Sequence, residues 1–570
     1  MNLSRFRLCV IFFFLLTIGT SCSSVRSGKD ASVHESVSDM SSAVTPVALA
    51  SSEMAPPVSQ KKNEIIPEPV LPEGVSPFEY EKIPEVPLLQ VPVQDVVAKV
   101  PQLGREVWYG VYVMNQKVGA MSSAWAMSEN GKTLVQKQTF RMEMNVLGGK
   151  KVLDLTTTIT YAANSGELLE HYTEQKADHL ERTVRLVRRP DGSHIATVKE
   201  RASGQEAAPE REYVPNRPLG GLQESDLAFS FVLQRGPDTW NANRAWRARK
   251  FMSMDISVAH EVGRVVSSVQ KQIANKRVAY HLVETVSDNP KSRVVSVYDQ
   301  DGILWISRVG SIEMRREDVS QARVGMGGHI DTGINAIIPL RIENPHPIEI
   351  LVLQLEGPFA VPNFLNTLRY RLEILENGKK KLTLTKDTLE GWEKPVPDKL
   401  QADIKKYLAA EPNIESDDSE IIALAKKAAG KAYRPVDIVS AVVNFVGDYV
   451  QDTMRSDIDS ARMVARMQKG DCTEHSILAT ALLRALGFPA RQVGGVAFVK
   501  MCRTSDDCLE GLGYHAWTQV WVGRWVDVDP TWKQTPADVT HVLMGTTTDM
   551  QWLESLGKLK VFIVEKVTQK

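Results

Sequence analysis

The sequence has few cysteines and no excess of charge of either sign. Five cysteines occur in 570 residues, too few for a fold that disulfides hold together. The 68 basic and 69 acidic side chains nearly cancel and form no long basic block, which excludes a nucleic-acid binder driven by phosphate contacts. This balance also argues against an acidic, fully disordered chain. The length predicts about three to five structural units.

Long apolar runs are also missing, except near the N-terminus. Residues 8–18 are almost entirely apolar, too short a run for a membrane span but suited to the core of a signal peptide. Arg5 and Arg7 precede this run, and Cys22 follows three small residues. The arrangement resembles a bacterial lipoprotein signal, which implies a lipidated Cys22. Gly19 stands where that family usually has an aliphatic residue, so a plain secretory signal and a retained anchor stay open.

Each of these alternatives places the rest of the chain outside the cytoplasm. We therefore expect residues 1–22 to be a lipoprotein-type signal peptide. The protein is then expected in the cell envelope, facing the periplasm or the outer surface, with secretion as the alternative. Residues 23–103 are rich first in serine and then in proline and lack hydrophobic periodicity. Such a segment cannot bury enough apolar surface to offset its ordering entropy, so we expect a disordered tether.

Two β-rich regions follow. Residues 104–328 contain runs that alternate apolar and polar side chains, such as 140–146 and 153–161, with turn pairs such as Asn130-Gly131 between them. This pattern predicts a large antiparallel β-rich domain. Shorter strand-like runs over residues 329–392 predict a small β module.

The hydrophobic period lengthens to about 3.6 residues in the last region, 393–570, and strand-like runs follow the helical ones. We therefore expect a multidomain chain with β-rich N-terminal regions and a C-terminal α+β domain. Within it, Asp471 and Glu474 have the spacing of a capping box, so Cys472 begins a helix. The positive end of the helix dipole favours a thiolate at Cys472, and free N–H groups of the first turn would receive an oxyanion.

A nucleophilic cysteine needs a base and a group that orients the base. His515 is predicted at the start of a strand, and Asp529 follows the next strand after a tight turn. Antiparallel pairing of these strands brings His515 and Asp529 to the same end of the hairpin. Asp527 shares the face of Asp529 but lies further along the strand, and it is our second choice as the orienting carboxylate.

Three motifs carry a resemblance to a known family. In chain order they are Gly-Asp-Cys-Thr-Glu-His at 470–475, His-Ala-Trp at 515–517 and Asp-Pro-Thr at 529–531. They resemble the transglutaminase-like superfamily of cysteine enzymes, including its exported bacterial members, over about 415–565. The resemblance implies a papain-like core in which Cys472 is the nucleophile, His515 the base and Asp529 the orienting group.

Four residues within or beside these motifs are also expected near the site. Tyr514 and Trp517 flank the base and are expected to pack around the site, where either could shape an oxyanion hole. Glu474 and His475 are expected behind the nucleophile, in capping and packing roles, although His475 is also open as a competing base.

The remaining cysteines, Cys502 and Cys508, lie in a polar loop before the His motif. In an oxidising compartment we expect a disulfide between them at the rim of the cleft. A metal site that adds His515 and His541 fits poorly with this cysteine spacing. We expect neither a metal nor another cofactor.

These observations predict an exported thiol hydrolase or acyltransferase that cleaves peptide or carboxamide bonds through a thioester. Hydrolysis is favoured over cross-linking because water is abundant outside the cell. The expected partners are a peptide or protein substrate, with envelope components as candidates, and a membrane reached through Cys22, but no nucleic acid. The alternative is a non-catalytic scaffold or binding lipoprotein that keeps the fold.

Overall fold

The structure, a computed structural model, describes most of the chain after residue 66. The described residues are 67–99, 106–146, 149–177, 180–202, 204–234, 245–273, 276–289, 291–326, 337–359, 367–453, 460–502, 508–546, 554–555 and 557–568. The predicted signal peptide, Cys22 and the first part of the predicted tether lie outside these residues. None of the helices in the described part is long and apolar enough to cross a lipid bilayer.

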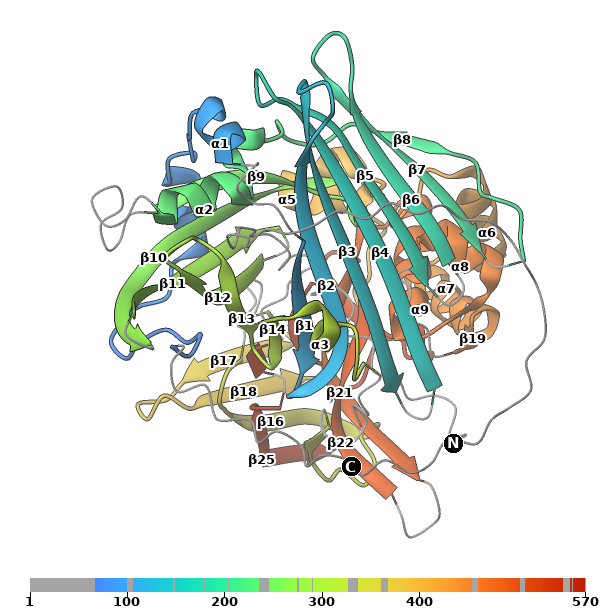
Figure 1. Cartoon of the computed structure of the whole chain (residues 1–570). Coiled ribbons are helices and arrows are strands. Elements are labelled where there is room, and N and C mark those ends of the chain that lie inside the picture. Colours follow the sequence, from blue (N-terminus) through green and yellow to red (C-terminus); the bar gives the residue numbers. More distant parts are fainter. Residues whose placement is uncertain are drawn as a thin grey trace, which may run out of the picture.

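The β-rich region forms one sheet of 14 antiparallel strands, in the order β8-β7-β6-β5-β4-β3-β2-β1-β14-β13-β12-β11-β10-β9. Its first eight strands are β1 (Val107–Val113), β2 (Gln116–Met127), β3 (Thr133–Val146), β4 (Gly149–Ala162), β5 (Leu168–Ala177), β6 (Leu180–Arg188), β7 (His194–Ala202) and β8 (Arg211–Tyr213). The others are β9 (Ala245–Met252), β10 (Ser257–Ile273), β11 (Lys276–Asp288), β12 (Lys291–Asp299), β13 (Leu304–Val309) and β14 (Ile312–Glu317). Figure 1 shows this sheet as a strongly curved wall. The predicted antiparallel β-rich domain is confirmed.

The sheet is built from hairpins between neighbouring strands, with one long return. Strands β1–β8 run outward from the centre, and α2 (Asp226–Gln234) precedes β9, from which the chain works back until β14 pairs with β1. Gly131 supplies the positive φ of +66° in the predicted Asn-Gly turn between β2 and β3. Burial alternates along β6, which leaves one row of side chains for the core.

The second part of the predicted tether packs on this sheet. Residues 80–85 form the 3-10 helix η2 (Tyr80–Glu85) and residues 93–99 form α1 (Val93–Lys99). Ile83 and Val96 are buried, and the Leu89 N–H donates to the Arg247 carbonyl at 2.7 Å. The prediction of a disordered tether over residues 23–103 is therefore wrong for residues 67–99. Proline-spaced apolar residues have no periodicity of their own, but an existing sheet can bury them one at a time.

A second sheet has four strands in the order β17-β18-β16-β25. Its strands are β16 (Ile348–Glu356), β17 (Tyr370–Ile374), β18 (Lys380–Thr385) and β25 (Lys560–Thr568). The small β module thus takes its edge strand β25 from the C-terminus, which we had placed in the catalytic domain. An isolated strand pattern does not indicate its partner, because a neighbouring strand supplies the backbone hydrogen bonds and the burial.

The C-terminal domain joins helices to a third sheet. The helices are α5 (Ala402–Lys405), α6 (Ser419–Ala429), α7 (Pro435–Tyr449), α8 (Ala461–Met467) and α9 (Cys472–Ala485). The sheet contains β15 (Ile338–Pro339), β21 (Ala490–Cys502), β22 (Cys508–Trp521), β23 (Trp525–Val528) and β24 (Val542–Thr546), with β22 at its centre between β15, β21 and β23. The short strands β19 (Gln451–Asp452) and β20 (Lys469–Gly470) pair with each other. Helix α9 is buried on nearly every side, and it packs against β21 and β22.

The three parts share their cores and are tied together by ion pairs. One cluster of buried apolar residues runs through the large sheet, the small sheet and the face of β21 and β22. Arg211 of β8 pairs with Asp417 at 2.7 Å, and Arg462 of α8 pairs with Glu200 of β7 at 3.4 Å. Figure 1 shows the helices of the C-terminal domain beside the edge of the large sheet that ends at β8. The α+β domain is therefore packed into the β-rich regions.

Candidate active site

Cys472 is the first residue of α9, as predicted. The Asp471 side chain accepts the Thr473 N–H at 2.9 Å, and Glu474 accepts the Asp471 N–H at 2.8 Å, which completes the capping box. Gly470 lies against this box, because a Cβ there would be 2.2 Å from the Glu474 Cβ. Of the first-turn N–H groups that we expect for an oxyanion, the box occupies those that follow Cys472 and not that of Cys472 itself. Cys472 itself is buried, with 3% of its surface exposed.

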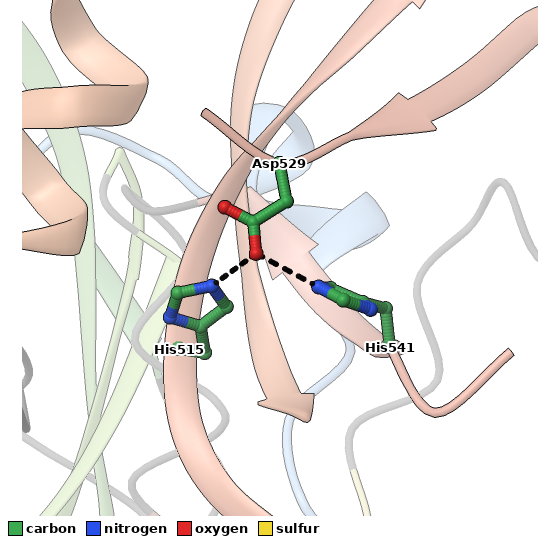
Figure 2. A group of neighbouring side chains, drawn as sticks. All are labelled: His515, Asp529 and His541. Carbon is green, nitrogen blue, oxygen red and sulfur yellow. Dashed lines mark hydrogen bonds and ion pairs between the residues drawn. The ribbon is translucent and has the colours of Figure 1, made fainter. Parts of the chain in front are cut away.

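His515 lies in the middle of β22, and not at a strand start as predicted. Gly511 and Gly513 suggest a break, but pairing with β21 continues through both residues. The His515 Nε2 lies 3.0 Å from Asp529 Oδ2, and Figure 2 shows the two side chains facing each other. Both are buried. The hairpin of β22 and β23 brings them together, as expected from its tight turn.

The thiol and the imidazole are also hydrogen-bond partners. Since Asp529 occupies Nε2 of His515, Nδ1 is the ring nitrogen left for the Cys472 sulfur. Burial alone would lower the pKa of His515, but the charges of Asp529 and Cys472 outweigh it and raise this pKa to about 10. Burial likewise opposes ionisation of Asp529, yet His515 and His541 hold the pKa of its carboxyl well below the usual range. The arrangement favours a thiolate–imidazolium pair at neutral pH.

Aromatic rings enclose the imidazole. Trp532 stacks on His515 with ring centroids 4.2 Å apart and an interplanar angle of 10°. Trp517 lies on the same face of β22, with its ring centroid 6.1 Å from that of His515. The indole N–H of Trp517 is buried and has no hydrogen-bond partner among the described residues. The walls therefore limit water around His515, and Trp517 offers a donor inside them.

The other residues predicted near the site separate into two groups. Glu474 and His475 lie behind the nucleophile as expected: the His475 ring nitrogens bond the carbonyls of Asp471 and Val450 at 2.7 and 3.1 Å. Both nitrogens are thereby engaged, which leaves His475 no free position as a base. Tyr514 alternates with His515 along β22, and its hydroxyl bonds Ser555 at 2.8 Å. The Tyr514 side chain therefore faces away from His515, and the expectation that it packs around the site is wrong.

Asp527, our second choice as the orienting carboxylate, serves another purpose. It is fully buried and pairs with Arg369 Nε at 2.8 Å. The Tyr370 hydroxyl also hydrogen-bonds its carboxylate. Asp527 thus links β23 to the small sheet through Tyr370, the first residue of β17, and Arg369 just before it, and it does not bond His515.

Sequence reasoning missed a second imidazole on the orienting carboxylate. His541 Nε2 lies 3.2 Å from Asp529 Oδ2, the oxygen that also faces His515 (Figure 2). The segment 537–541 after the Asp-Pro-Thr motif also resembles the family, but it predicts no role for His541 apart from a poorly fitting metal site. The ligating atoms of His515, Asp529 and His541 lie within 4.8 Å of one another, so they could hold a metal only by giving up both hydrogen bonds.

Cys502 and Cys508 are directly paired in the register of β21 and β22. Their side chains lie outside the described residues, so the disulfide between them stays a prediction. The loop that joins them is also outside the described part.

Part of the chain that contains this site is similar to a known protein family. The family described as the transglutaminase-like superfamily matches residues 422–530. An uncharacterised protein of Mycobacterium leprae is 30% identical over 118 residues, which are 20% of this chain and 41% of that protein. The chain thus spans about two fifths of that relative's length.

Two solved structures match parts of this chain. A proposed cysteine protease from Cytophaga hutchinsonii is 18% identical, with a TM-score of 0.24, and the match covers 39% of this chain and 88% of that chain. A β-barrel-like protein of unknown function from Brucella abortus is 11% identical, with a TM-score of 0.26, and the match covers 37% and 94%. At these values neither structure indicates a substrate for this chain.

The matched residues 422–530 contain Cys472, His515 and Asp529, and His541 lies just beyond them. Helix α9 and strands β21–β23 supply the thiol-enzyme fold that the motifs indicate. Residues 422–530 of this chain are therefore a domain of the transglutaminase-like superfamily.

Proposed function

We propose that the protein is a thiol enzyme that cleaves peptide or carboxamide bonds through a thioester on Cys472. One observation carries the proposal: the hydrogen-bonded series from Cys472 through His515 to Asp529 begins at the first residue of a capped helix. The helix dipole and the imidazolium both favour the thiolate. A structural cysteine has no need of this arrangement.

The reaction follows from the positions of the three groups. The Cys472 thiolate attacks the substrate carbonyl carbon and forms a C–S bond. His515 then gives its proton to the leaving amine as the C–N bond breaks, and a thioester remains. In the second half, neutral His515 takes a proton from water, the hydroxide attacks the thioester, and the C–S bond breaks to release the acid. If an amine replaces water, the same steps form a new amide.

The oxyanion of each tetrahedral intermediate requires a donor. The capping box occupies the first-turn N–H groups of α9 that follow Cys472, and we assign this role to the buried indole N–H of Trp517, which has no partner among the described residues. A donor held in place in a site shielded from water stabilises a developing charge without reorganisation. Trp517→Phe removes the donor and keeps most of the ring, so it is the variant of choice for this role.

The setting of the reaction is part of the proposal. We propose export through residues 1–22, anchoring to a membrane through Cys22, and hydrolysis in preference to cross-linking. Peptide or protein substrates of the cell envelope are then the nearest source of amide bonds. A non-catalytic binding protein is the competing function, but a buried cysteine paired with a charged histidine favours catalysis.

The decisive experiment measures the reactivity of Cys472. The purified protein is treated with iodoacetamide at pH 7, and alkylation of Cys472 is followed by mass spectrometry. We expect alkylation at least tenfold faster than that of free cysteine, because the helix N-terminus and the imidazolium both favour the thiolate. His515→Gln removes the imidazolium and is expected to lose this advantage. If wild-type Cys472 reacts no faster than free cysteine, the enzyme proposal fails.

A second assay separates the two acyl acceptors. The protein is incubated with a denatured protein substrate, with and without a fluorescent primary amine. New peptide fragments that depend on Cys472 support hydrolysis. Incorporation of the amine without fragments would overturn the preference for hydrolysis and leave the thioester proposal intact.

A further inference from the structure

The Asp529 carboxylate is held by four donors. Its Oδ1 accepts the backbone N–H groups of Thr531 and Trp532 at 2.8 and 3.3 Å. Its Oδ2 faces the two imidazoles, His515 at 3.0 Å and His541 at 3.2 Å. Because both oxygens of the carboxylate are hydrogen-bonded, its orientation is fixed. The fixed carboxylate in turn holds the His515 imidazole in one orientation. The proposed triad uses only one of these four contacts.

His541 is itself fixed between two carboxylates. On the side away from Asp529, its Nδ1 lies 3.3 Å from the Asp538 carbonyl and 3.4 Å from Asp538 Oδ1. Both ring nitrogens therefore face oxygen acceptors, and a ring that donates at both positions carries a positive charge. Burial works against this charge, but hydrogen bonds to Asp529 and Asp538 outweigh it and raise the pKa of His541.

The loop that carries His541 is attached to the small sheet. Arg369 donates to the Ala537 carbonyl at 3.1 Å and to the Asp538 carbonyl at 2.5 Å. The Tyr370 hydroxyl lies 3.0 Å from the His541 carbonyl. Arg369 and Tyr370 are fully or almost fully buried and also bond Asp527 of β23. One pair of residues thus ties the His541 loop to the strand that precedes Asp529.

We propose that His541 is a positioning residue of this site, held by Arg369 and Tyr370 at the small sheet, and that it fixes the Asp529 carboxylate through Oδ2, the oxygen that also faces His515. The proposal rests on the proposed function only in that His515 is the base. It gives the small β module, which lies outside the matched family segment, a part in the geometry of the site.

The proposal has an electrostatic consequence that a purely structural residue would not have. The ring centroids of His515 and His541 are 5.8 Å apart. Two unit charges at 5.8 Å shift a pKa by roughly two units at an effective dielectric constant of about 20. His541 therefore restrains protonation of His515, while it keeps Asp529 in place. The other charged groups that face His541 are Asp529 and Asp538.

The test measures the pKa of individual histidines. The rate at which the imidazole C2 hydrogen exchanges is followed by mass spectrometry as a function of pH. It uses the full chain with Cys472→Ala, which removes the thiol from the titration of His515. Adding His541→Gln keeps an N–H donor toward Asp529 but removes the charge. We expect the pKa of His515 to rise by about one to two units. His281→Gln, which replaces a buried histidine that bonds Ser268 in the large sheet, is the matched control and should leave it unchanged.

The positioning role is tested by alkylation of Cys472 with iodoacetamide in the chain that keeps its thiol. For histidines that bind a metal, the outer hydrogen-bond partners contribute about tenfold to a hundredfold, and we take the lower end for His515. We expect His541→Ala to slow alkylation by about tenfold, His541→Gln to restore part of the rate, and Tyr370→Phe to slow it less than His541→Ala.

The outcomes distinguish this proposal from the proposed function. An unreactive wild-type Cys472 overturns the enzyme proposal, whereas the exchange measurement is independent of the thiol. An unchanged His515 pKa in the His541→Gln variant, with His541 protonated in its parent, overturns the positioning proposal. If His541→Ala does not fold, the His541→Gln and Tyr370→Phe variants still decide it.

Discussion

Gly495 is the residue at which a single methyl group should disturb the site most directly. It pairs with His515 on β22 and with Leu543 on β24. A Cβ at Gly495 would lie 2.0 Å from the Val542 carbonyl oxygen and 2.9 Å from the Trp517 ring. Ordinary contact begins at 3.4 Å, so 3.4 − 2.0 = 1.4 Å must be gained by moving β24 away from β21.

The magnitude follows from these contacts. Overpacking of a well-packed core costs about 1–3 kcal/mol, and the atom in the way here is backbone, so we expect the upper end, about 3 kcal/mol. Val542 adjoins His541, so the shift also displaces the second imidazole. A misplacement of about 1 Å can slow a reaction by about a hundredfold, so Cys472 alkylation should fall at least tenfold in Gly495→Ala.

Urea unfolding and iodoacetamide alkylation measure the two effects. The control is Gly378→Ala in the turn between β17 and β18, where φ is +75° and no atom lies within 4 Å of the new methyl group. That variant should lose about 1 kcal/mol through its left-handed backbone and keep its reactivity. If Gly495→Ala unfolds at the wild-type urea concentration and reacts at the wild-type rate, the close packing of β21, β24 and Trp517 is refuted.

Three further predictions concern the helix cap at Cys472, the segment 67–99 that packs on the large sheet, and the pH dependence of stability. Glu474→Ala removes the bond to the Asp471 N–H and should cost about 1 kcal/mol in urea unfolding while slowing Cys472 alkylation; an unchanged rate would show that the box does not position the thiol. Glu284 pairs with Arg264 at 2.6 Å and Arg293 at 2.9 Å and accepts the Phe78 N–H at 3.0 Å. Glu284→Ala should therefore lower the free energy of unfolding by about 3–5 kcal/mol and expose Lys82 to trypsin, and resistance equal to wild type would contradict the anchoring. Burial, with the nearby charge of Glu200, raises the pKa of Glu415 from 4.5 to about 7. A raised carboxyl pKa contributes stability below pH 4.5 that is lost as pH rises through about 7. Glu415→Gln should therefore match wild type at pH 4.5 and exceed its stability at pH 8 by up to about 3 kcal/mol, and equal urea midpoints at pH 8 would refute the shift.

Local patterns predicted the elements around the nucleophile well. The capping box at Asp471 and Glu474, and the proline that opens α7, depend on side-chain chemistry within one turn of the chain. The tight turn between β22 and β23 likewise determines which residues meet across that hairpin. These features need no partner from elsewhere in the sequence, and the structure contains them as expected.

Contacts between distant segments were not predictable in the same way. The segment 67–99 looks disordered by composition, yet Ile83 and Val96 are buried against the large sheet. The sequence of β25 contains no pattern that predicts pairing with the small sheet rather than with the sheet of the catalytic domain. His541 differs from any other buried histidine only because β24 and the loop before it return to the side of Asp529.

The sequence by itself determined the motif order, the helix that begins at Cys472 and the hairpin that joins His515 to Asp529, because each rests on local backbone chemistry. Only the tertiary structure decided that Asp529 serves two imidazoles, that Asp527 belongs to Arg369 and Tyr370, and that the small sheet supports the site. Those contacts join segments that are far apart in the sequence. A buried charge is stable only where groups from such segments pair with it, so the contacts depend on the tertiary structure.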